Sequence, residues 1–174
     1  MIASFQSRDQ EKRAAQHATP AHTPPMSVCD FSAHWKLLQD KALEVMLEGG
    51  SEKEVQKLLD SLTQLLFGLD EYLKQKATNA LDLIIQLVNS TTASQPIILS
   101  ALKAIQSCVT RNAVGRQQCR AAGVFEFLST TLDEYAQQVV VVEEAMTTLA
   151  AMSMCNDLNA KQVCVRFYDV CVLT

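Results

Sequence analysis

The stretch of sequence that decides the fold is residues 101–109, ALKAIQSCV, together with residues 121–128, AAGVFEFL. In both segments apolar residues recur three or four positions apart, which is the spacing of one face of an α-helix. Gly123 lies inside the second segment. Because glycine adopts positive φ angles at little steric cost, this position predicts a sharp turn between two helices. The stretch therefore predicts amphipathic helices that follow one another through short turns.

The same pattern occurs again about 44 residues further along the chain. When residues 71–113 are laid over residues 115–157 without a gap, the apolar positions of three helical segments coincide. The matched pairs are Ala77/Ala121, Ala80/Val124, Leu81/Phe125, Leu83/Phe127, Ile84/Leu128, Val88/Leu132, Ile97/Val141, Ile98/Val142, Ala101/Ala145, Leu102/Met146, Ile105/Leu149 and Cys108/Met152, and Asn112 meets Asn156. A helical repeat of this length predicts an α-solenoid, in which each unit buries its apolar face against the next.

The signals before the repeats predict a leader and two helices. Residues 1–28 hold three of the four prolines and few large apolar residues, and they predict a disordered leader. Asp30 is a candidate cap for a helix that ends at the Gly49-Gly50 pair. Ser51 and Glu54 have the spacing of a capping box, which predicts a second helix after them. This second helix fits the repeat at an offset of 43, so residues 29–69 are interpreted as a degenerate first repeat.

The remaining boundaries follow from the same register. Residues 70–113 and 114–157 are the two clear repeats, and residues 158–174 are a partial repeat or a cap. A complete unit needs about 44 residues. We therefore expect a short solenoid that is incomplete at its C-terminus, and self-association through that end if its apolar residues stay uncovered.

Composition and charge exclude several classes of protein. The 174 residues are 48% hydrophobic and include five glycines and four prolines, which excludes collagen-like and low-complexity chains. The net charge of -4 disfavours binding to nucleic acid or anionic lipid. No apolar run reaches the roughly 18 residues that a membrane span needs. The six cysteines contain no C-x-x-C pair and fall mostly in apolar helical patterns, which favours reduced thiols and a cytoplasmic location, with the nucleus also allowed.

Residues with catalytic chemistry are scarce. All three histidines precede residue 35, and the chain has no phosphate-binding G-K-[ST] motif, no G-x-S-x-G and no H-E-x-x-H. His17, His22, Cys29 and His34 lack the close spacing of a zinc site. Cys119 lies near Arg116 and Arg120, so it is either an activated thiol or, as we favour, a buried structural one. We expect no enzyme activity, no cofactor and no metal.

The run from Ala101 to Val109, then Asn112, then residues 121–128 resembles the junction between two repeats of the armadillo family. The resemblance covers about residues 51–165 and is to the family, not to one member. It implies an all-α fold, a right-handed α-solenoid of three-helix repeats. It also implies a non-catalytic scaffold that binds an extended peptide or partner protein along a concave groove lined by the third helices.

The groove positions that the resemblance implies are Lys103, Ser107 and Arg111 on one repeat and Thr147, Ala151 and Cys155 on the next. The nuclear-import branch of the family places tryptophan and asparagine in this groove to hold basic peptides. Because this chain has neither at these positions, basic cargo is disfavoured, and Lys103 and Arg111 favour an acidic or phosphorylated segment. The alternative is a compact helical bundle that serves as an accessory or oligomerisation subunit of a larger complex.

Overall fold

A computed structural model describes residues 27–77 and 79–172, and the leader predicted for residues 1–28 lies almost entirely outside this part of the chain. The described residues form helices and short connections without a strand, which confirms the all-α prediction. The helices are α2 (Val28–Glu48), α3 (Glu52–Leu66), α4 (Glu71–Lys76), α5 (Ala80–Asn89), α6 (Gln95–Val109), α7 (Ala113–Gln118), α8 (Val124–Glu134), α9 (Val139–Ser153) and α10 (Asp157–Val172).

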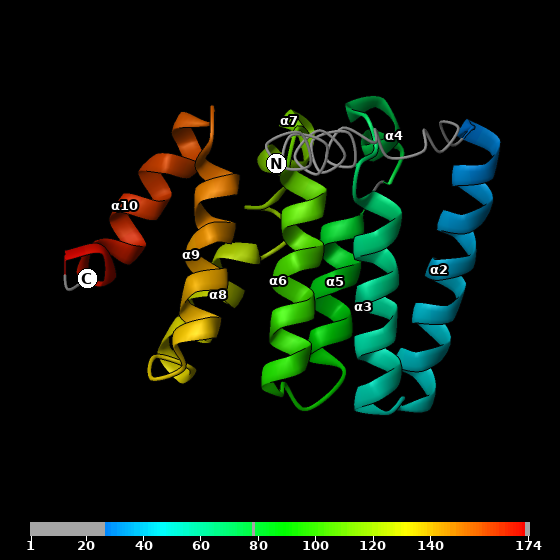
Figure 1. Cartoon of the computed structure of the whole chain (residues 1–174), viewed down its shortest axis with the longest axis horizontal. Helices are drawn as coiled ribbons and strands as arrows, with labels where there is room; N and C mark the ends of the chain where they lie inside the picture. The colour runs from blue at the N-terminus through cyan, green and yellow to red at the C-terminus, as the bar shows by residue number, and fades with distance from the viewer. Residues whose placement is uncertain (1–26, 78, 173–174) are drawn as a thin grey trace, which may run out of the picture.

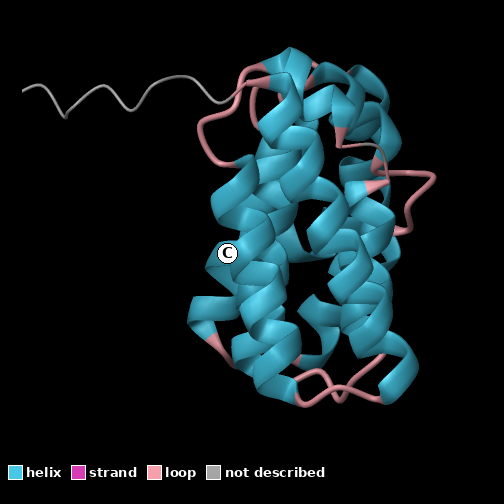
Figure 2. Ribbon diagram, turned by 90° about the vertical axis from the view of Figure 1, so that its right-hand side faces the viewer, coloured by secondary structure: helices cyan, strands magenta, loops and turns pink. Residues whose placement is uncertain are grey.

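The helices are arranged in rows (Figure 1). The 15-residue helices α3, α6 and α9 lie side by side, and α6 packs against both of the others. A second row is formed by α2, α5 and α8, which lie against each other in that order. The short helices α4 and α7 contact each other at one end of the rows. Figure 2, which looks along the rows from the α2 end, shows the two layers of long helices.

Local signals in the sequence place most of the turns. Gly49 ends α2 with a φ of 71°, and Gly123 precedes α8 with a φ of 73°, as predicted. The predicted capping box is present, since the Ser51 N–H donates to the Glu54 carboxylate at 2.8 Å. The cap of α2 differs from the prediction. Ser27 accepts the N–H of Asp30 at 3.1 Å, so α2 begins three residues earlier than the sequence indicated.

The repeat register shifts by two residues at the short helices. Asp70 caps α4 and Asn112 caps α7, so these helices begin 42 residues apart, whereas Asn79 and Gly123 before α5 and α8 are 44 apart. The turn between α7 and α8 is two residues longer than that between α4 and α5. The pairing of Ala77 with Ala121 was therefore wrong. Ala77 is buried, Ala121 is exposed, and the buried counterpart 42 residues after Ala77 is Cys119.

The core runs continuously between neighbouring helices. Ile97, Ala101 and Ile105 of α6 are fully buried, and so are their counterparts Val141 and Ala145 of α9. Other matched pairs differ in burial. Ile98 and Leu102 are buried, while Val142 and Met146 are only partly buried.

Three equivalent turns follow the long helices in a left-handed conformation. Gly68 has a φ of 77°, and Arg111 and Cys155 each have a φ of 53°. A Cβ at Gly68 would meet nothing within 4 Å, so only the backbone opposes a side chain there. We expect Gly68→Ala to lower the free energy of unfolding by about 1 kcal/mol and Cys155→Gly to raise it by a similar amount. Urea unfolding measures both, and a Gly68→Ala chain that is no less stable, or a Cys155→Gly chain that is no more stable, than the unmodified chain would contradict the turn conformation.

Candidate partner-binding groove

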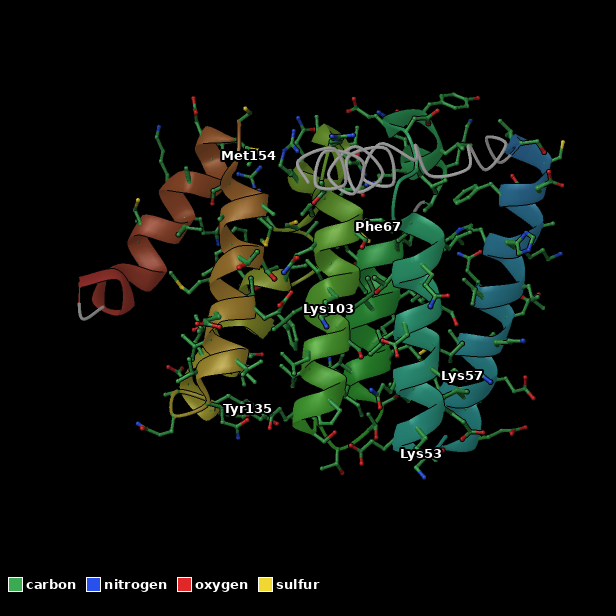
Figure 3. All side chains as sticks on the ribbon, in the orientation of Figure 1. Lys53, Lys57, Phe67, Lys103, Tyr135 and Met154 are labelled. Carbon is green, nitrogen blue, oxygen red and sulfur yellow. The ribbon has the colours of Figure 1, made fainter. Side chains whose placement is uncertain are left out.

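A groove of about 490 Å³ lies between α3 and α6, near the ends of both helices. Its lining residues are Thr63, Phe67, Gly68, Leu69, Lys74, Lys103, Gln106, Ser107, Thr110 and Arg111. Three of them are cationic, and none carries a carboxylate. Figure 3 shows Phe67, directly after α3, and Lys103 on α6 on the face that the row of long helices presents to the viewer. The groove is therefore positively charged, although the chain as a whole carries a net charge of -4.

Lys74 brings a buried ammonium group to this groove. It is the fourth residue of α4, and only 6% of its surface is exposed. Its Nζ donates to the Thr110 carbonyl at 2.7 Å, at the end of α6. Burial lowers the pKa of Lys74 below the ordinary value for lysine, and the charge of Arg111 lowers it further, partly offset by Cys108. A negative group in the groove would counter both effects.

The first predicted trio lines this groove, but not as one face of a helix. Lys103 and Arg111 are exposed, whereas Ser107 is only 8% exposed. The helix α6 ends at Val109, so the expected spacing of four along a single helix fails for Arg111. Arg111 reaches the groove from the left-handed turn that follows the helix. Ser107 therefore exposes less of its surface than Lys103 and Arg111 do.

The second predicted trio lies outside the α3–α6 groove. Thr147 and Ala151 are on α9, and Cys155 follows that helix. The Thr147 hydroxyl donates to the Glu143 carbonyl at 2.8 Å, so it is already partnered.

A hydrogen-bonded bridge joins α6 to α9. Gln106 Nε2 donates to Glu144 Oε1 at 2.7 Å and to Thr148 Oγ1 at 3.0 Å. Gln106 also lines the groove on the α3 side of α6. The bridge fixes one wall of the groove relative to α9.

Two of the described cysteines, Cys108 and Cys119, are buried in the core. Cys119 is fully buried, as predicted, and burial raises the pKa of Cys108 and of Cys119 to about 12. Cys29, Cys155 and Cys164 are exposed, so the expectation of core positions holds for only part of the set. Among the side chains that the structure describes, no group of three or more from His, Cys, Asp or Glu is placed to hold a metal ion.

Two further observations concern the membrane and self-association. Among the helices that the structure describes, none combines the length and the apolar character needed to cross a membrane. Leu158 and Val165 of α10 are exposed. Self-association through the C-terminal end stays a prediction.

Sequence reasoning missed Lys74 and Phe67. Phe67 immediately follows Leu66, the last residue of α3, and 78% of its surface is exposed. The available signal for Lys74 was weak. It is the fourth residue of α4 as Arg116 is the fourth of α7, and both donate to the last carbonyls of α6. Lys74 and Arg116 correspond to each other only when the two segments are compared at an offset of 42 residues.

Comparisons of the chain with protein-family models, with curated proteins and with solved structures found no match.

Proposed function

We propose that this protein is a non-catalytic scaffold that binds an extended segment of a partner protein along the exposed face of α3, α6 and α9. The observation that carries the proposal is the cationic α3–α6 groove, which opens on this face. In this proposal the chain is a right-handed, armadillo-like α-solenoid, with units at residues 29–69, 70–113 and 114–157. The partner segment would bind to the exposed surfaces of α3, α6 and α9, and this binding requires no catalytic side chain.

Hydrogen bonds between helices support the solenoid part of the proposal. The long-range bonds from side chains of one unit to atoms of the next join residues 38 to 43 positions apart, close to one repeat. Examples are Tyr135 with the Ala93 carbonyl at 2.5 Å and Asn159 with the Arg116 carbonyl at 2.7 Å. A solenoid has this property because each unit contacts only its neighbours. A compact bundle, the alternative, would also join distant helices around one centre.

The shape and chemistry of the exposed face support peptide binding. The groove combines exposed apolar surface at Phe67 with the cations Lys103 and Arg111. An extended chain laid across the helices can place successive side chains against both kinds of surface. Positive charge without a neighbouring carboxylate favours acidic or phosphorylated segments over basic ones.

The test is selection of binding peptides and measurement of their affinity for a charge-reversed groove. Decapeptides displayed on phage are selected against the full chain, synthesised and titrated by fluorescence polarisation. We expect Lys103→Glu with Arg111→Glu to weaken binding at least about tenfold, because two attractive contacts become repulsive. The variant should fold normally, since both side chains are exposed and Arg111 gives way to another side chain with a Cβ.

The matched control is Lys53→Glu with Lys57→Glu. Both lysines are exposed on α3, toward the end away from Phe67, and the change in net charge is the same (Figure 3). This control should bind the selected peptides as the unmodified chain does. Unchanged binding by a folded Lys103/Arg111 variant would rule the groove out.

A further inference from the structure

We propose that the α3–α6 groove contains an anion subsite in which the buried ammonium of Lys74 receives the carboxylate or phosphate of a partner's side chain. This inference rests on the proposed function. It assigns the preference for an acidic partner segment to Lys74, a residue of the short helix α4. Lys74, Lys103 and Arg111 come from α4, α6 and the turn after α6, and all three line one groove. Three cations from separate elements converge on a volume that holds no carboxylate.

Burial distinguishes Lys74 from the other two cations. Exposed lysines and arginines are solvated, and their contacts contribute little to affinity. Lys74 is only 6% exposed, so its side chain is less hydrated in the free protein than those of Lys103 and Arg111. An ammonium has three N–H donors, and the Thr110 carbonyl accepts from it at 2.7 Å. A bound anion would gain a strong, charge-assisted hydrogen bond and would restore the solvation that burial removed.

The apolar part of the groove defines what accompanies the anion. Phe67 is 78% exposed and lines the same groove as Lys74. An aromatic or aliphatic side chain next to the acidic residue would cover this ring and exclude water from the charge pair. The occupant we infer is therefore an acidic partner segment with an apolar residue beside its negatively charged one. Carboxylate and phosphate share this chemistry, and the test separates them.

Lys74 also has a structural contact that the test must separate from ligand binding. Its bond to Thr110 places a cation at the carbonyl end of α6, where Arg116 donates to the Val109 carbonyl at 3.0 Å. Cations at this end stabilise a helix. A purely structural lysine would affect stability but would confer no preference for an anion. The decisive measurement is accordingly binding of small anions, compared with a neutral molecule of the same shape.

The probes are phenyl phosphate and 3-phenylpropionate, with neutral 3-phenylpropanamide as the comparison. Each is titrated into the ¹⁵N-labelled full chain while backbone amide signals are followed by NMR. We expect both anions to shift the signals of Ser107, Thr110 and Arg111, and the amide to leave them in place. The anion that binds more tightly identifies phosphate or carboxylate as the preferred group.

Three variants locate the effect. Lys74→Met should weaken anion binding at least about tenfold, and Lys74→Arg should retain most of it. Lys76→Met is the matched control, because Lys76 is exposed on the same helix and its loss changes the net charge equally; it should bind as the unmodified chain does. If Lys74→Met fails to fold, the neutral amide decides the question in the unmodified chain, since equal shifts with amide and anion would overturn the subsite.

Failure of this inference differs from failure of the proposed function. Peptides that bind Lys74→Met as tightly as the unmodified chain, yet lose affinity for the Lys103/Arg111 variant, would overturn the Lys74 subsite alone. Phenyl phosphate binding that depends on Lys74, with no peptide bound on this face, would support the subsite and overturn the scaffold proposal.

Discussion

Replacing Leu149 with alanine is expected to lower the free energy of unfolding by about 2–5 kcal/mol. Leu149 is 2% exposed on α9, where it faces the core shared with α6, and removing most of its side chain leaves a cavity that the packed helices cannot close. Ile105, its counterpart on α6, is fully buried, and Ile105→Ala should cost a similar amount. Single domains are typically stable by only about 5–15 kcal/mol. Either variant therefore removes a large part of the total.

Leu47→Ala provides a control with the same chemical change. Leu47 lies on α2 and is 78% exposed, so we expect its replacement to change stability by less than about 0.5 kcal/mol. Urea unfolding followed by circular dichroism compares the three variants. Similar stability of Leu149→Ala and Leu47→Ala would show that α9 does not pack on α6 in solution.

Much of the fold was predictable because its signals are local. The capping box at Ser51 and the left-handed turn at Gly123 depend on a few adjacent residues, and both are present as predicted. The register shift between α4 and α7 was not predictable from the apolar pattern. The two extra residues lie in the turn before α8, and Ala121 in this turn is a small apolar residue that matches a core position by type alone. Only the exposure of Ala121 in the structure shows that it does not occupy a core position.

The candidate groove was predicted only in part. Lys103 and Arg111 were groove positions implied by the resemblance to the armadillo family, and both line the α3–α6 groove. Lys74 was missed because its place in the groove depends on how α4 docks against the end of α6, which a linear pattern does not contain. The second trio was placed by analogy with the first.

The docking of the short helices leads to the second large effect, at Gly115. This glycine is buried in α7, and an added Cβ would lie 2.6 Å from Asn112 Nδ2 and 2.8 Å from the Cys108 carbonyl oxygen. Asn112 cannot simply move away. Its Nδ2 donates to the Cys108 carbonyl at 2.9 Å, and its Oδ1 accepts the Gly115 N–H at 3.1 Å, so the side chain ties α7 to the end of α6.

Gly115→Ala should therefore destabilise the protein by about 2–4 kcal/mol, combining about 1–3 kcal/mol for overpacking with about 1 kcal/mol for the disturbed cap. The sign is informative, because alanine in an unhindered helix is about 1 kcal/mol better than glycine. Thermal and urea unfolding measure the effect, with Val114→Ala on the exposed side of α7 as the control. A Gly115→Ala protein as stable as the original would mean that α7 stands away from α6. Arg116 on α7 would then lose its contact with the Val109 carbonyl, and the arrangement of cations at the end of α6 would have to be reconsidered.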